Sequence, residues 1–540
     1  MQTKGCEILL VGYEEGENLG LRYIRSFLNQ YEITTHIEPF SPGKKEKILE
    51  VCLSLSPLIV GFSMIFQRFL PDFAELITYL RKNEVNGHFT MGGHYPSVES
   101  RQVLEYIPDL DSVVRCEGEY ALLDLFERLR AGSSLSVVPG ITYREGMEII
   151  SNGPRTLIEN LDLLPFPERE ARPLKVLGLG VSTILCSRGC IYDCSFCSIR
   201  RFYKEAIGPR RRARSASNVA DEIQCIYNTI GSRVFIFEDD DFYARNKAQY
   251  RWAEEFLEEL SRRRLENQIA WRMSCRIDDI DEVMLSRMMG AGLLCVYIGI
   301  EAGNDSSLRV YNKKYNVDQV RKSLAVLEKL RLSYEYGFMV LNPYCTLETI
   351  REDIQFLKEI SASCLALAHF TKMVPYAGTP AEAKLKEEGR LFGAPVAPDY
   401  SYLDPKIEIL EHFFHEAFSF RNFNNTGLVE KLRYMKFCIS LMHRFYPETL
   451  HKYNYEETLR DFIFRANYEF LEKASLAANL ISDLDEDKIV RAWPLLEKYI
   501  RETRQFEQKL GNEIDTWYRH IEQSVKSSGY ALESFGIQSQ

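Results

Sequence analysis

Short apolar runs alternate with amphipathic stretches over the first 135 residues of the chain. Five apolar runs of three to five residues are bounded by turn residues and predict buried strands. The stretches between them, such as 20–30 and 70–82, carry apolar residues at helical spacing. Strands that alternate with helices predict an α/β domain with a parallel, doubly wound sheet. The predicted strands are 7–11, 33–37, 58–62, 88–91 and 112–114.

A linker and a second alternation of strands and helices follow. Residues 136–179 are interpreted as a linker, because two prolines among apolar residues, between Leu163 and Pro167, favour an extended and packed connection. From 180 to 388 six strands are predicted, which is typical of a partial (β/α)6 barrel with its chemistry at the carboxyl ends of the strands. These strands are 181–185, 234–237, 270–274, 296–300, 336–341 and 366–372.

From 389 to 540 the pattern is helical and rich in aromatic residues. We interpret this range as a helical C-terminal domain and expect its helices to close over the mouth of the barrel. His412, His415, His443 and His451 lack the spacing of a metal site with a third partner, so surface or core positions are favoured for them. The predicted helices are 407–421, 428–445, 455–481, 488–504 and 512–523.

Composition places the chain among ordinary globular proteins. Of its 540 residues, 45% are hydrophobic and 27% are charged. The first residues lack the apolar core of a signal peptide, and no apolar run approaches the roughly 20 residues that span a bilayer, so a cytoplasmic protein without a membrane span is expected. The 13 cysteines are scattered singly outside one loop, which favours a reducing compartment.

The net charge of −10 offers no overall attraction for nucleic acid. One local basic patch exists, at Arg210, Arg211, Arg212 and Arg214. These guanidinium groups could clamp a phosphate or carboxylate, but a solvated turn after Gly208-Pro209 is the favoured interpretation. A nucleic-acid partner is therefore not expected.

Three cysteines lie on one short loop after the first strand of the second series. Cys190, Cys194 and Cys197 have the spacing CxxxCxxC, with Phe196 before the last cysteine. Three thiolates can hold one iron-sulfur cluster and leave one iron open to another molecule. The alternatives are a zinc site or unrelated buried thiols. Cys186 could be a fourth ligand, although a small core residue at the end of the strand is favoured.

This loop resembles that of the radical S-adenosylmethionine (SAM) superfamily, in which the open iron binds the amino and carboxylate groups of SAM. The resemblance implies a 4Fe-4S cluster on the three cysteines, SAM as a second cofactor with Phe196 among its contacts, and an external electron donor such as flavodoxin or ferredoxin. Pro375-Tyr376-Ala377-Gly378-Thr379-Pro380 resembles a closing motif of the same family.

Further motifs of the superfamily follow the cysteine loop in order. The acidic segment after 234–237 implies that Glu238 and Asp239 hold the ammonium group of SAM. Arg272, Ser274 and Arg276 alternate along one strand, so they face one side and can reach the carboxylate or the ribose. The resemblance further implies ribose or ammonium contacts for Glu301 and a role for Lys313 in the loop that follows.

The segments after the strands of the first sheet carry a second resemblance. Ligands of doubly wound sheets bind at the carboxyl ends of the strands, near the switch point. Val60-Gly-Phe-Ser63, Met91-Gly-Gly-His-Tyr-Pro-Ser97 and Cys116-Glu-Gly-Glu119 resemble the flavodoxin-like cobalamin-binding domain that precedes many radical SAM enzymes. Glycines there allow the tail of a large ligand to approach the backbone. The implied cobalamin contacts are Ser63, Gln67, Arg68, Gly92, Gly93, His94, Glu117 and Gly118.

One departure concerns the cobalt ligand. Classical cobalamin mutases carry Asp-x-His-x-x-Gly after the first strand, and the aligned stretch here runs from Glu15 to Gly20 without a histidine. The radical SAM relatives share this absence, which implies base-off, His-off cobalamin. Its lower face would be covered by the loop with Phe66, Gln67 and Arg68. The alternative is a Rossmann-like domain with no cofactor or another nucleotide, although no GxGxxG motif supports NAD.

Together the two resemblances imply a cobalamin-dependent radical SAM methyltransferase acting on an unactivated carbon of a small-molecule substrate. In that scheme a 5′-deoxyadenosyl radical abstracts hydrogen, and the substrate radical takes a methyl group from methylcobalamin. Alternatives are a non-methylating cyclase or rearrangement enzyme, and a cofactor sensor without turnover. A transfer-RNA methylthiotransferase would need three more cluster cysteines in the N-terminal domain. Cys6, Cys52 and Cys116 lie there, but Cys6 precedes the first strand and Cys52 lies within a helix.

Overall fold

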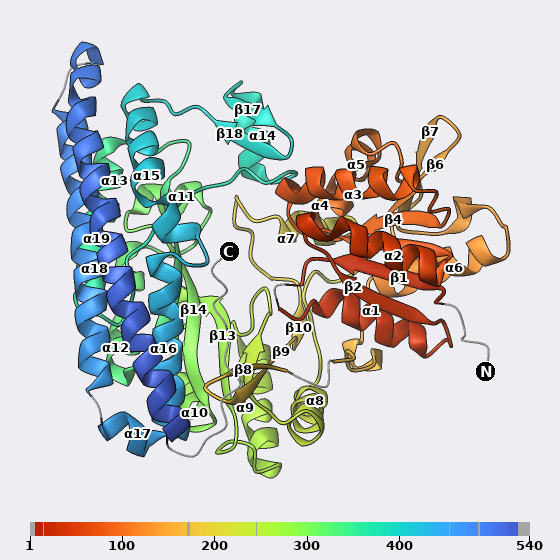
Figure 1. Cartoon of the computed structure of the whole chain (residues 1–540), viewed down its shortest axis with the longest axis horizontal. Helices are drawn as coiled ribbons and strands as arrows, with labels where there is room; N and C mark the ends of the chain where they lie inside the picture. The colour runs from red at the N-terminus through yellow and green to blue at the C-terminus, as the bar shows by residue number, and fades with distance from the viewer. Residues whose placement is uncertain are drawn as a thin grey trace. The chain divides into compact units, whose positions relative to one another are not determined.

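The computed structural model describes residues 6–14, 16–169, 173–244, 246–452, 454–483 and 486–527 (Figure 1). Backbone contacts divide the chain into two compact units. The first unit comprises Met1–Ala171, Leu185–Asn218 and Val374–Tyr400. The second comprises Arg172–Ile184, Val219–Met373 and Ser401–Gln540. The units therefore interleave along the chain, whereas domain boundaries at 135, 179 and 388 follow chain order and stay a prediction.

The first unit contains a seven-stranded sheet in the order β2-β1-β3-β4-β5-β6-β7. The pairs among its first five strands are parallel, and the order reverses between β1 and β3, which makes this point the switch point. Each predicted strand is present, displaced by at most two residues. The strands are β1 (Ile8–Gly12), β2 (Thr35–Pro39), β3 (Ile59–Ser63), β4 (His88–Gly92), β5 (Ser112–Val114), β6 (Ile141–Glu145) and β7 (Glu148–Ser151).

Helices cover both faces of this sheet, because alternate strand residues point to opposite sides. Leu9 and Val11 share an apolar cluster with α2, α3 and α5, whereas Ile8 and Leu10 share another with α1 and α6. The predicted doubly wound α/β architecture is confirmed. The helices are α1 (Leu19–Asn29), α2 (Lys45–Leu55), α3 (Leu70–Lys82), α4 (His94–Val98), α5 (Ser100–Tyr106) and α6 (Gly118–Arg130).

A hairpin extends the sheet within the range interpreted as a linker. β6 pairs antiparallel with β5 and with β7, and the turn between β6 and β7 contains Gly146 at φ +60°. A two-residue loop with glycine is typical of a hairpin. The sequence analysis did not predict β6 and β7, although this signal is present. The remaining elements of the first unit are β10 (Ser187–Arg188), α7 (Ile199–Lys204), β11 (Arg212–Ala213), α14 (Pro380–Glu387), β17 (Leu391–Ala394) and β18 (Ala397–Tyr400).

The second unit contains a curled sheet in the order β16-β15-β14-β13-β12-β9-β8. The six strands from β9 to β16 are parallel, and β8 adds an antiparallel edge. This architecture confirms the predicted partial barrel. The strands are β8 (Leu174–Val176), β9 (Leu179–Ile184), β12 (Ser232–Phe237), β13 (Ala270–Arg276), β14 (Leu293–Glu301), β15 (Ser333–Leu341) and β16 (Thr371–Lys372). The alternating helices are α8 (Ala216–Thr229), α9 (Lys247–Arg262), α10 (Glu282–Gly290), α11 (Asp305–Val310), α12 (Val317–Leu330) and α13 (Leu347–Ser361).

The sixth barrel strand is shorter than predicted. β16 has only two residues, Thr371–Lys372, instead of 366–372. The preceding main chain bonds to a side chain of a C-terminal helix instead of to β15. Asn467 donates to the Ala366 carbonyl at 3.0 Å and accepts from the Ala368 N–H at 2.8 Å. Because buried main-chain groups need partners, this amide replaces the ladder.

The C-terminal range is helical, as predicted. One expectation was wrong: 488–504 and 512–523 belong to a single helix, because the intervening residues favour helix and Gly511 costs only about 1 kcal/mol in a helix interior. No helix in the described part of the chain is both long and apolar enough to cross a bilayer. The helices are α15 (Pro405–Phe423), α16 (Leu428–Phe445), α17 (Pro447–Lys452), α18 (Tyr455–Ser482) and α19 (Glu486–Ser527).

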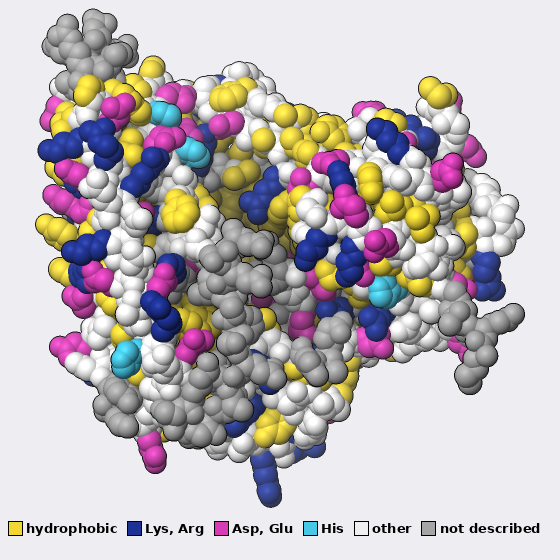
Figure 2. Space-filling model, in the orientation of Figure 1, with side chains coloured by type: hydrophobic (Ala, Val, Ile, Leu, Met, Phe, Trp, Pro, Cys, Tyr) yellow, Lys and Arg dark blue, Asp and Glu magenta, His cyan; other side chains and the backbone are white. Residues whose placement is uncertain are grey.

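α16 covers the amino-terminal halves of the barrel strands. Its apolar face joins one cluster with the early strand residues Val181, Val234 and Ala270. Its cations donate to main-chain carbonyls at the strand starts, with Lys436 bonding at the start of β15 and Arg444 just before β13. The expectation that these helices close the mouth is therefore wrong for α16, since the apolar strand residues that it covers lie at the opposite ends. Charges of both signs mix on the outer faces of these helices (Figure 2).

Candidate functional site

Small residues lie side by side at the carboxyl ends of three central strands of the first unit. Gly12, Ser63 and Gly92 are partners in the parallel register of β1, β3 and β4. Ser63 and Gly92 retain partial exposure. Because no large side chain rises from these positions, the sheet edge at the switch point leaves room for a ligand.

Gly93 has a backbone conformation that side chains rarely adopt. Its φ is +109°, and an added Cβ would lie 2.0 Å from the carbonyl oxygen of Met64. Met64 directly follows β3, so the loops after β3 and β4 touch at this glycine. Glycine at position 118 is explained by packing and not by backbone conformation. A Cβ there would lie 2.8 Å from the Ile24 side chain of α1. This glycine serves the packing of α6 on α1.

The loop after β1 holds acidic side chains that are already paired. Glu14 lies 2.5 Å from Arg22, and Glu17 lies 2.5 Å from Arg169. Glu15, the first residue of the stretch aligned with Asp-x-His-x-x-Gly, lies outside the described residues. Since this loop carries no histidine, it offers no imidazole to a metal.

The loop after β3 carries the other predicted contacts, and the structure separates them. Phe66 is exposed, and the exposed Arg68 guanidinium lies 5.7 Å from its ring and 4.7 Å from that of Phe69. Gln67 is only 4% exposed, and its amide bonds to main-chain groups of the segment 374–400. Both ends of the Gln67 amide thus have protein partners, and its contact with a ligand stays a prediction.

His94, at the start of α4, packs on the segment that follows the cysteine loop. Its ring lies 4.4 Å from that of Phe202 in α7. Burial lowers the pKa of His94 to about 4, so the imidazole is neutral at pH 7. This contact joins the loop after β4 to the chain that carries the cysteines.

Glu117 belongs to a buried ion cluster at the base of the cysteine loop. Arg188 lies 3.1 Å from Glu117 and 2.5 Å from Glu119, and Arg212 lies 2.9 Å from Glu117. The two arginines are partners across β10 and β11. Burial raises the pKa of Glu117, but Arg188 and Arg212 outweigh it and lower the pKa below its usual value. Glu117 thus anchors the cysteine loop to the sheet.

The basic patch is not the solvated turn that was favoured. Arg212 is 6% exposed and Arg214 is 4% exposed. Arg214 donates to the Leu185 carbonyl at 2.8 Å, and Arg210 pairs with Asp193 of the cysteine loop at 2.7 Å. The guanidinium groups fasten segments of the first unit to each other, because long-range partners outside the local sequence satisfy them.

The cysteine loop is partly buried and held from two sides. Cys190, Cys194 and Cys197 form no disulfide and are of intermediate burial, and Phe196 is also half-buried. Gly189 has φ +83°, and an added Cβ would lie 1.8 Å from the carbonyl oxygen of Arg210. The Ser195 carbonyl accepts from the Ala381 N–H of α14 at 3.0 Å. The loop is therefore held in one shape by contacts on both sides of the cysteines.

No three His, Cys, Asp or Glu side chains in the described ranges are gathered closely enough to hold a single metal ion. In a four-iron cluster each cysteine binds its own iron, so three thiolates need not converge on one point. Cys186 is 1% exposed, as expected of a core residue. Cys6 precedes β1 and Cys116 follows β5. Because these strands run parallel, the two cysteines lie at opposite ends of the strands of the first sheet.

In the second unit, Glu238 and Asp239 follow β12. Asp239 is 5% exposed, whereas Glu238 keeps access to solvent. The Glu238 N–H donates to the Ile184 carbonyl of β9 at 2.9 Å, which fixes the turn at the strand ends. Partial desolvation raises the pKa of Glu238, Arg272 opposes this rise, and Asp239 adds to it. The pair offers two carboxylates in different environments.

On β13, the half-buried Arg272 and Ser274 alternate with buried residues, whereas Arg276 at the end of the strand is itself buried. The two arginines differ in how tightly their guanidinium groups are paired with carboxylates. Arg272 lies 4.0 Å from Glu335, a loose contact, whereas Arg276 forms a two-bond pair with Asp278 at 2.8 and 3.0 Å. Arg272 is thus less tightly paired than Arg276, and Ser274, like Arg272, is half-buried.

Glu301 and Lys313, twelve residues apart, meet in the structure. Glu301 Oε1 lies 3.0 Å from Lys313 Nζ, and Lys313 is 7% exposed. Glu301 has φ +71° at a bulge of β14, and its carboxylate turns back over Gly299 and Gly337. A Cβ on Gly299 would lie 2.6 Å from this carboxylate, so the glycines make room for it. Such a strained acidic residue is typical of a functional site.

Sequence reasoning missed a buried polar group beside β16. Arg433 of α16 bonds to His369 Nε2 at 3.0 Å, and the His369 ring lies 4.8 Å from Tyr336. Burial and then Arg433 lower the pKa of His369 to about 3, so the imidazole is neutral. No spacing could have revealed this group, because its members lie on three separate elements.

Four histidines of the C-terminal range were expected at surface or core positions, and those with described side chains match this expectation. His412 and His415 are exposed, and His443 pairs with Glu456. The side chain of His451 lies outside the described residues.

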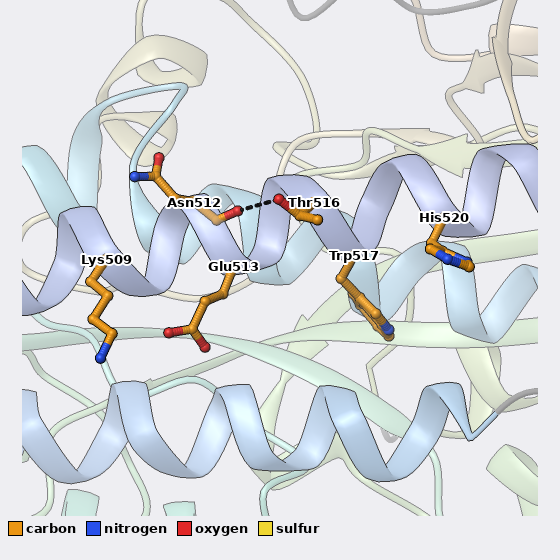
Figure 3. Close-up of a pocket in the computed structure, with 6 residues that line it drawn as sticks. All are labelled: Lys509, Asn512, Glu513, Thr516, Trp517 and His520. Atoms are coloured by element: carbon orange, nitrogen blue, oxygen red, sulfur yellow. Dashed lines mark hydrogen bonds between the residues drawn. The ribbon is translucent and has the colours of Figure 1, made fainter.

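An open groove on α19 is distinct from all predicted site residues. Figure 3 shows Lys509, Glu513 and Trp517 projecting from α19 toward the neighbouring helix. Glu513 pairs with Arg465 of α18 at 2.8 Å, and Trp517 packs edge-on against Phe462. The ion pair and the aromatic contact hold α18 and α19 together, so we interpret these residues as part of the packing between the two helices.

Two family models match the chain. The B12 binding domain matches residues 8–126, and the radical SAM superfamily matches residues 184–357. An uncharacterized methyltransferase of Pyrococcus horikoshii is 26% identical over 422 residues, which cover 75% of this chain and 85% of the relative. The anaerobic magnesium-protoporphyrin IX monomethyl ester cyclase of Cereibacter sphaeroides is 27% identical over 359 residues, which cover 64% of this chain and 56% of the cyclase.

Solved structures share the fold. The cobalamin-dependent S-adenosylmethionine radical enzyme OxsB, solved with aqua-cobalamin and S-adenosylmethionine bound, superposes with a TM-score of 0.68 at 18% identity, over 98% of this chain and 82% of OxsB. The radical S-adenosylmethionine methyltransferase TsrM of Kitasatospora setae, solved with cobalamin and a 4Fe-4S cluster, gives 0.60 at 17% identity, over 71% of this chain and 78% of TsrM.

Proposed function

Because this chain belongs to the cobalamin-binding radical SAM enzymes, we propose that it methylates an unactivated carbon of a small-molecule substrate. One observation carries the proposal: a single compact unit contains both the open edge of a cobalamin-type sheet and the CxxxCxxC loop. The similarity to a methyltransferase over most of both chains supports this reaction.

The residues present fit the three cofactors. Three cysteines without a disulfide on one loop suit a 4Fe-4S cluster, and the glycines at 92 and 93 leave space where a cobalamin tail would pass. When bound, the cluster and SAM supply a 5′-deoxyadenosyl radical, and cobalamin supplies the methyl group. Cys190, Cys194 and Cys197 would hold the cluster.

Residues of the second unit would hold SAM. Glu238 and Asp239 provide negative charge for its ammonium group, and Ser274 provides a hydroxyl. Glu301, held by Lys313, would accept from the ribose hydroxyls, since the ion pair fixes the carboxylate in one position. Arg276 would act indirectly in this scheme, because Asp278 already occupies its guanidinium.

A second candidate is ring closure without methylation, which the similarity to a cyclase favours. Counting products separates the two. With its substrate and reductant, a methyltransferase is expected to form S-adenosylhomocysteine and 5′-deoxyadenosine in equal amounts, because one SAM donates the methyl group and another forms the radical. Quantitative mass spectrometry of both products checks this. 5′-Deoxyadenosine without S-adenosylhomocysteine would instead assign the cyclase reaction.

The lower face of the cobalamin offers a prediction that does not require the substrate. We expect the electron paramagnetic resonance spectrum of bound cobalt(II) to be base-off without nitrogen superhyperfine splitting, because the loop after β1 has no histidine. Arg68→Ala is expected to change this spectrum, since a nearby cation disfavours a positively charged, higher-coordinate cobalt.

Arg25→Ala is the control for Arg68→Ala. Arg25 lies on α1 and pairs with Glu168 at 2.5 Å, away from the carboxyl edge of the sheet. Its spectrum should match that of the parent protein. Nitrogen splitting in the parent protein would contradict the His-off interpretation. An Arg68→Ala spectrum identical to the control would indicate that another loop covers the lower face of the cobalamin.

A further inference from the structure

Gln67 joins the loop after β3 to a distant segment of the same unit. Its side-chain amide donates to the Pro395 carbonyl at 2.8 Å and accepts from the Ala377 N–H at 3.1 Å. The residue is only 4% exposed, and its partners follow more than 300 positions later in the sequence. A side chain that must both donate and accept at one buried place has few substitutes, since glutamine and asparagine alone carry a neutral amide.

Two further contacts fix the loop that Gln67 holds. The Met64 N–H donates to the Gly92 carbonyl at 2.9 Å, and the Tyr95 N–H donates to the Ile65 carbonyl at 3.1 Å. The start of the loop is therefore tied to β4 and α4. Without Gln67, the following residues, including the exposed Arg68, would have no described hydrogen bond to the rest of the unit beyond the turn itself.

The segment that receives Gln67 also contacts the cysteine loop. The Ala381 N–H donates to the Ser195 carbonyl at 3.0 Å. Gly378, at φ +72°, leaves room for Arg201 of α7, whose Cγ would lie 2.7 Å from an added Cβ. Tyr376 packs at 6.0 Å from the Phe66 ring. One segment thus touches the loop after β3 and the loop of the cluster cysteines.

Tyr376 lies within electrostatic reach of both loops. Burial raises the pKa of its hydroxyl, the Arg68 guanidinium opposes this rise, and the Cys197 thiol adds to it. Of these groups, the Phe66 ring packs directly against Tyr376 of the segment 374–400.

We propose that Gln67 is a positioning residue of the cobalamin site: by bonding to Ala377 and Pro395 it locks the loop with Phe66 and Arg68 onto the segment that also supports the cysteine loop. The inference deepens the proposed function and rests on it, because the locked loop is the one assigned to the lower face of the cobalamin. It replaces the expectation that Gln67 itself faces the cofactor.

The lock is tested first on the full-length protein before cofactors are added. Gln67→Met keeps the side-chain volume but removes the donor and the acceptor. Trypsin should then cut after Arg68 about tenfold faster than in the parent protein, because two buried hydrogen bonds no longer hold the loop. Mass spectrometry identifies the cut. The control is Gln30→Met, which changes an exposed glutamine at the end of α1 and should leave the rate unchanged.

The second readout is the cobalt(II) spectrum of the cobalamin-loaded protein. Gln67→Met is expected to give broadened lines or a second species, because Arg68 then samples several positions, while Gln30→Met gives the parent spectrum. If Gln67→Met does not purify folded, Gln67→Glu serves instead, since it retains the acceptor for Ala377 and should give a smaller increase in cutting.

Parent-like cutting and a parent-like spectrum in the folded variant would overturn the lock. Faster cutting with an unchanged spectrum would show a lock without a role in positioning and would overturn the proposal as well. Failure of the parent protein to bind cobalamin would contradict the proposed function, yet the trypsin result would still report whether the lock exists.

Discussion

Changing Cys190, Cys194 and Cys197 together to alanine is expected to abolish both cluster binding and SAM cleavage. Each thiolate would hold one iron of a 4Fe-4S cluster, and in the structure the three cysteines lie on one loop and form no disulfide. Anaerobic reconstitution of the parent protein should give about four irons per chain. The triple variant should retain essentially none and form no 5′-deoxyadenosine.

Cys186→Ala is the matched control for the triple variant. Cys186 lies four residues before the loop but is 1% exposed in the core. Its loss should lower stability by about 1 kcal/mol through a small cavity and leave iron content unchanged. Iron determination and chromatography of 5′-deoxyadenosine check both variants. Iron and SAM cleavage retained by the triple variant would refute the cluster assignment, and iron lost from Cys186→Ala would make that residue a ligand.

Gly93→Ala is expected to destabilise the first unit and to remove cobalamin binding. The added Cβ would lie 2.0 Å from the Met64 carbonyl oxygen, and φ +109° is strained for any side chain. The loops after β3 and β4 must then move apart, at a cost of about 3 kcal/mol or more. Thermal unfolding of the apoprotein measures the first effect, and the cobalamin absorbance of the reconstituted protein measures the second.

Gly92→Ala tests whether position, and not merely the loss of a glycine, matters. A Cβ on Gly92 would lie 3.6 Å from the Val114 carbonyl oxygen, an ordinary contact, and Gly92 ends a strand. The free energy of unfolding of this variant should differ from that of the parent protein by no more than about 0.5 kcal/mol. Equal destabilisation of both variants would contradict the close approach of the two loops at Gly93.

Local patterns were sufficient for most of the fold. The first five strands of the first sheet, β9 and β12 to β15 of the second, and the helix 428–445 were predicted from apolar periodicity, because each is stabilised by burying a face that the sequence displays. The strands β6, β7 and β8 were not predicted, and β16 is shorter than predicted. The order of the motifs along the chain was likewise readable, since parallel strands bring their carboxyl ends to one edge. Ser63 and Gly92, both predicted as cobalamin contacts, are partners in the register of β3 and β4.

Contacts between distant segments decided the rest. The first residues predicted for β16 have their main chain bonded to Asn467, and Arg212 is buried against Glu117, 95 residues away. Glu301 meets Lys313 only because a bulge at the end of β14 turns the carboxylate back over two glycines.

Gln67 illustrates the division between the two levels. Its place after β3 was readable in the sequence and suggested a ligand contact, but its amide bonds to Ala377 and Pro395. The chain by itself determined which elements form and which residues carry chemistry, because both depend on neighbours in sequence. Which polar side chains support the structure and which stay available was decided by the tertiary structure, since a buried polar group takes whatever partner the fold brings to it.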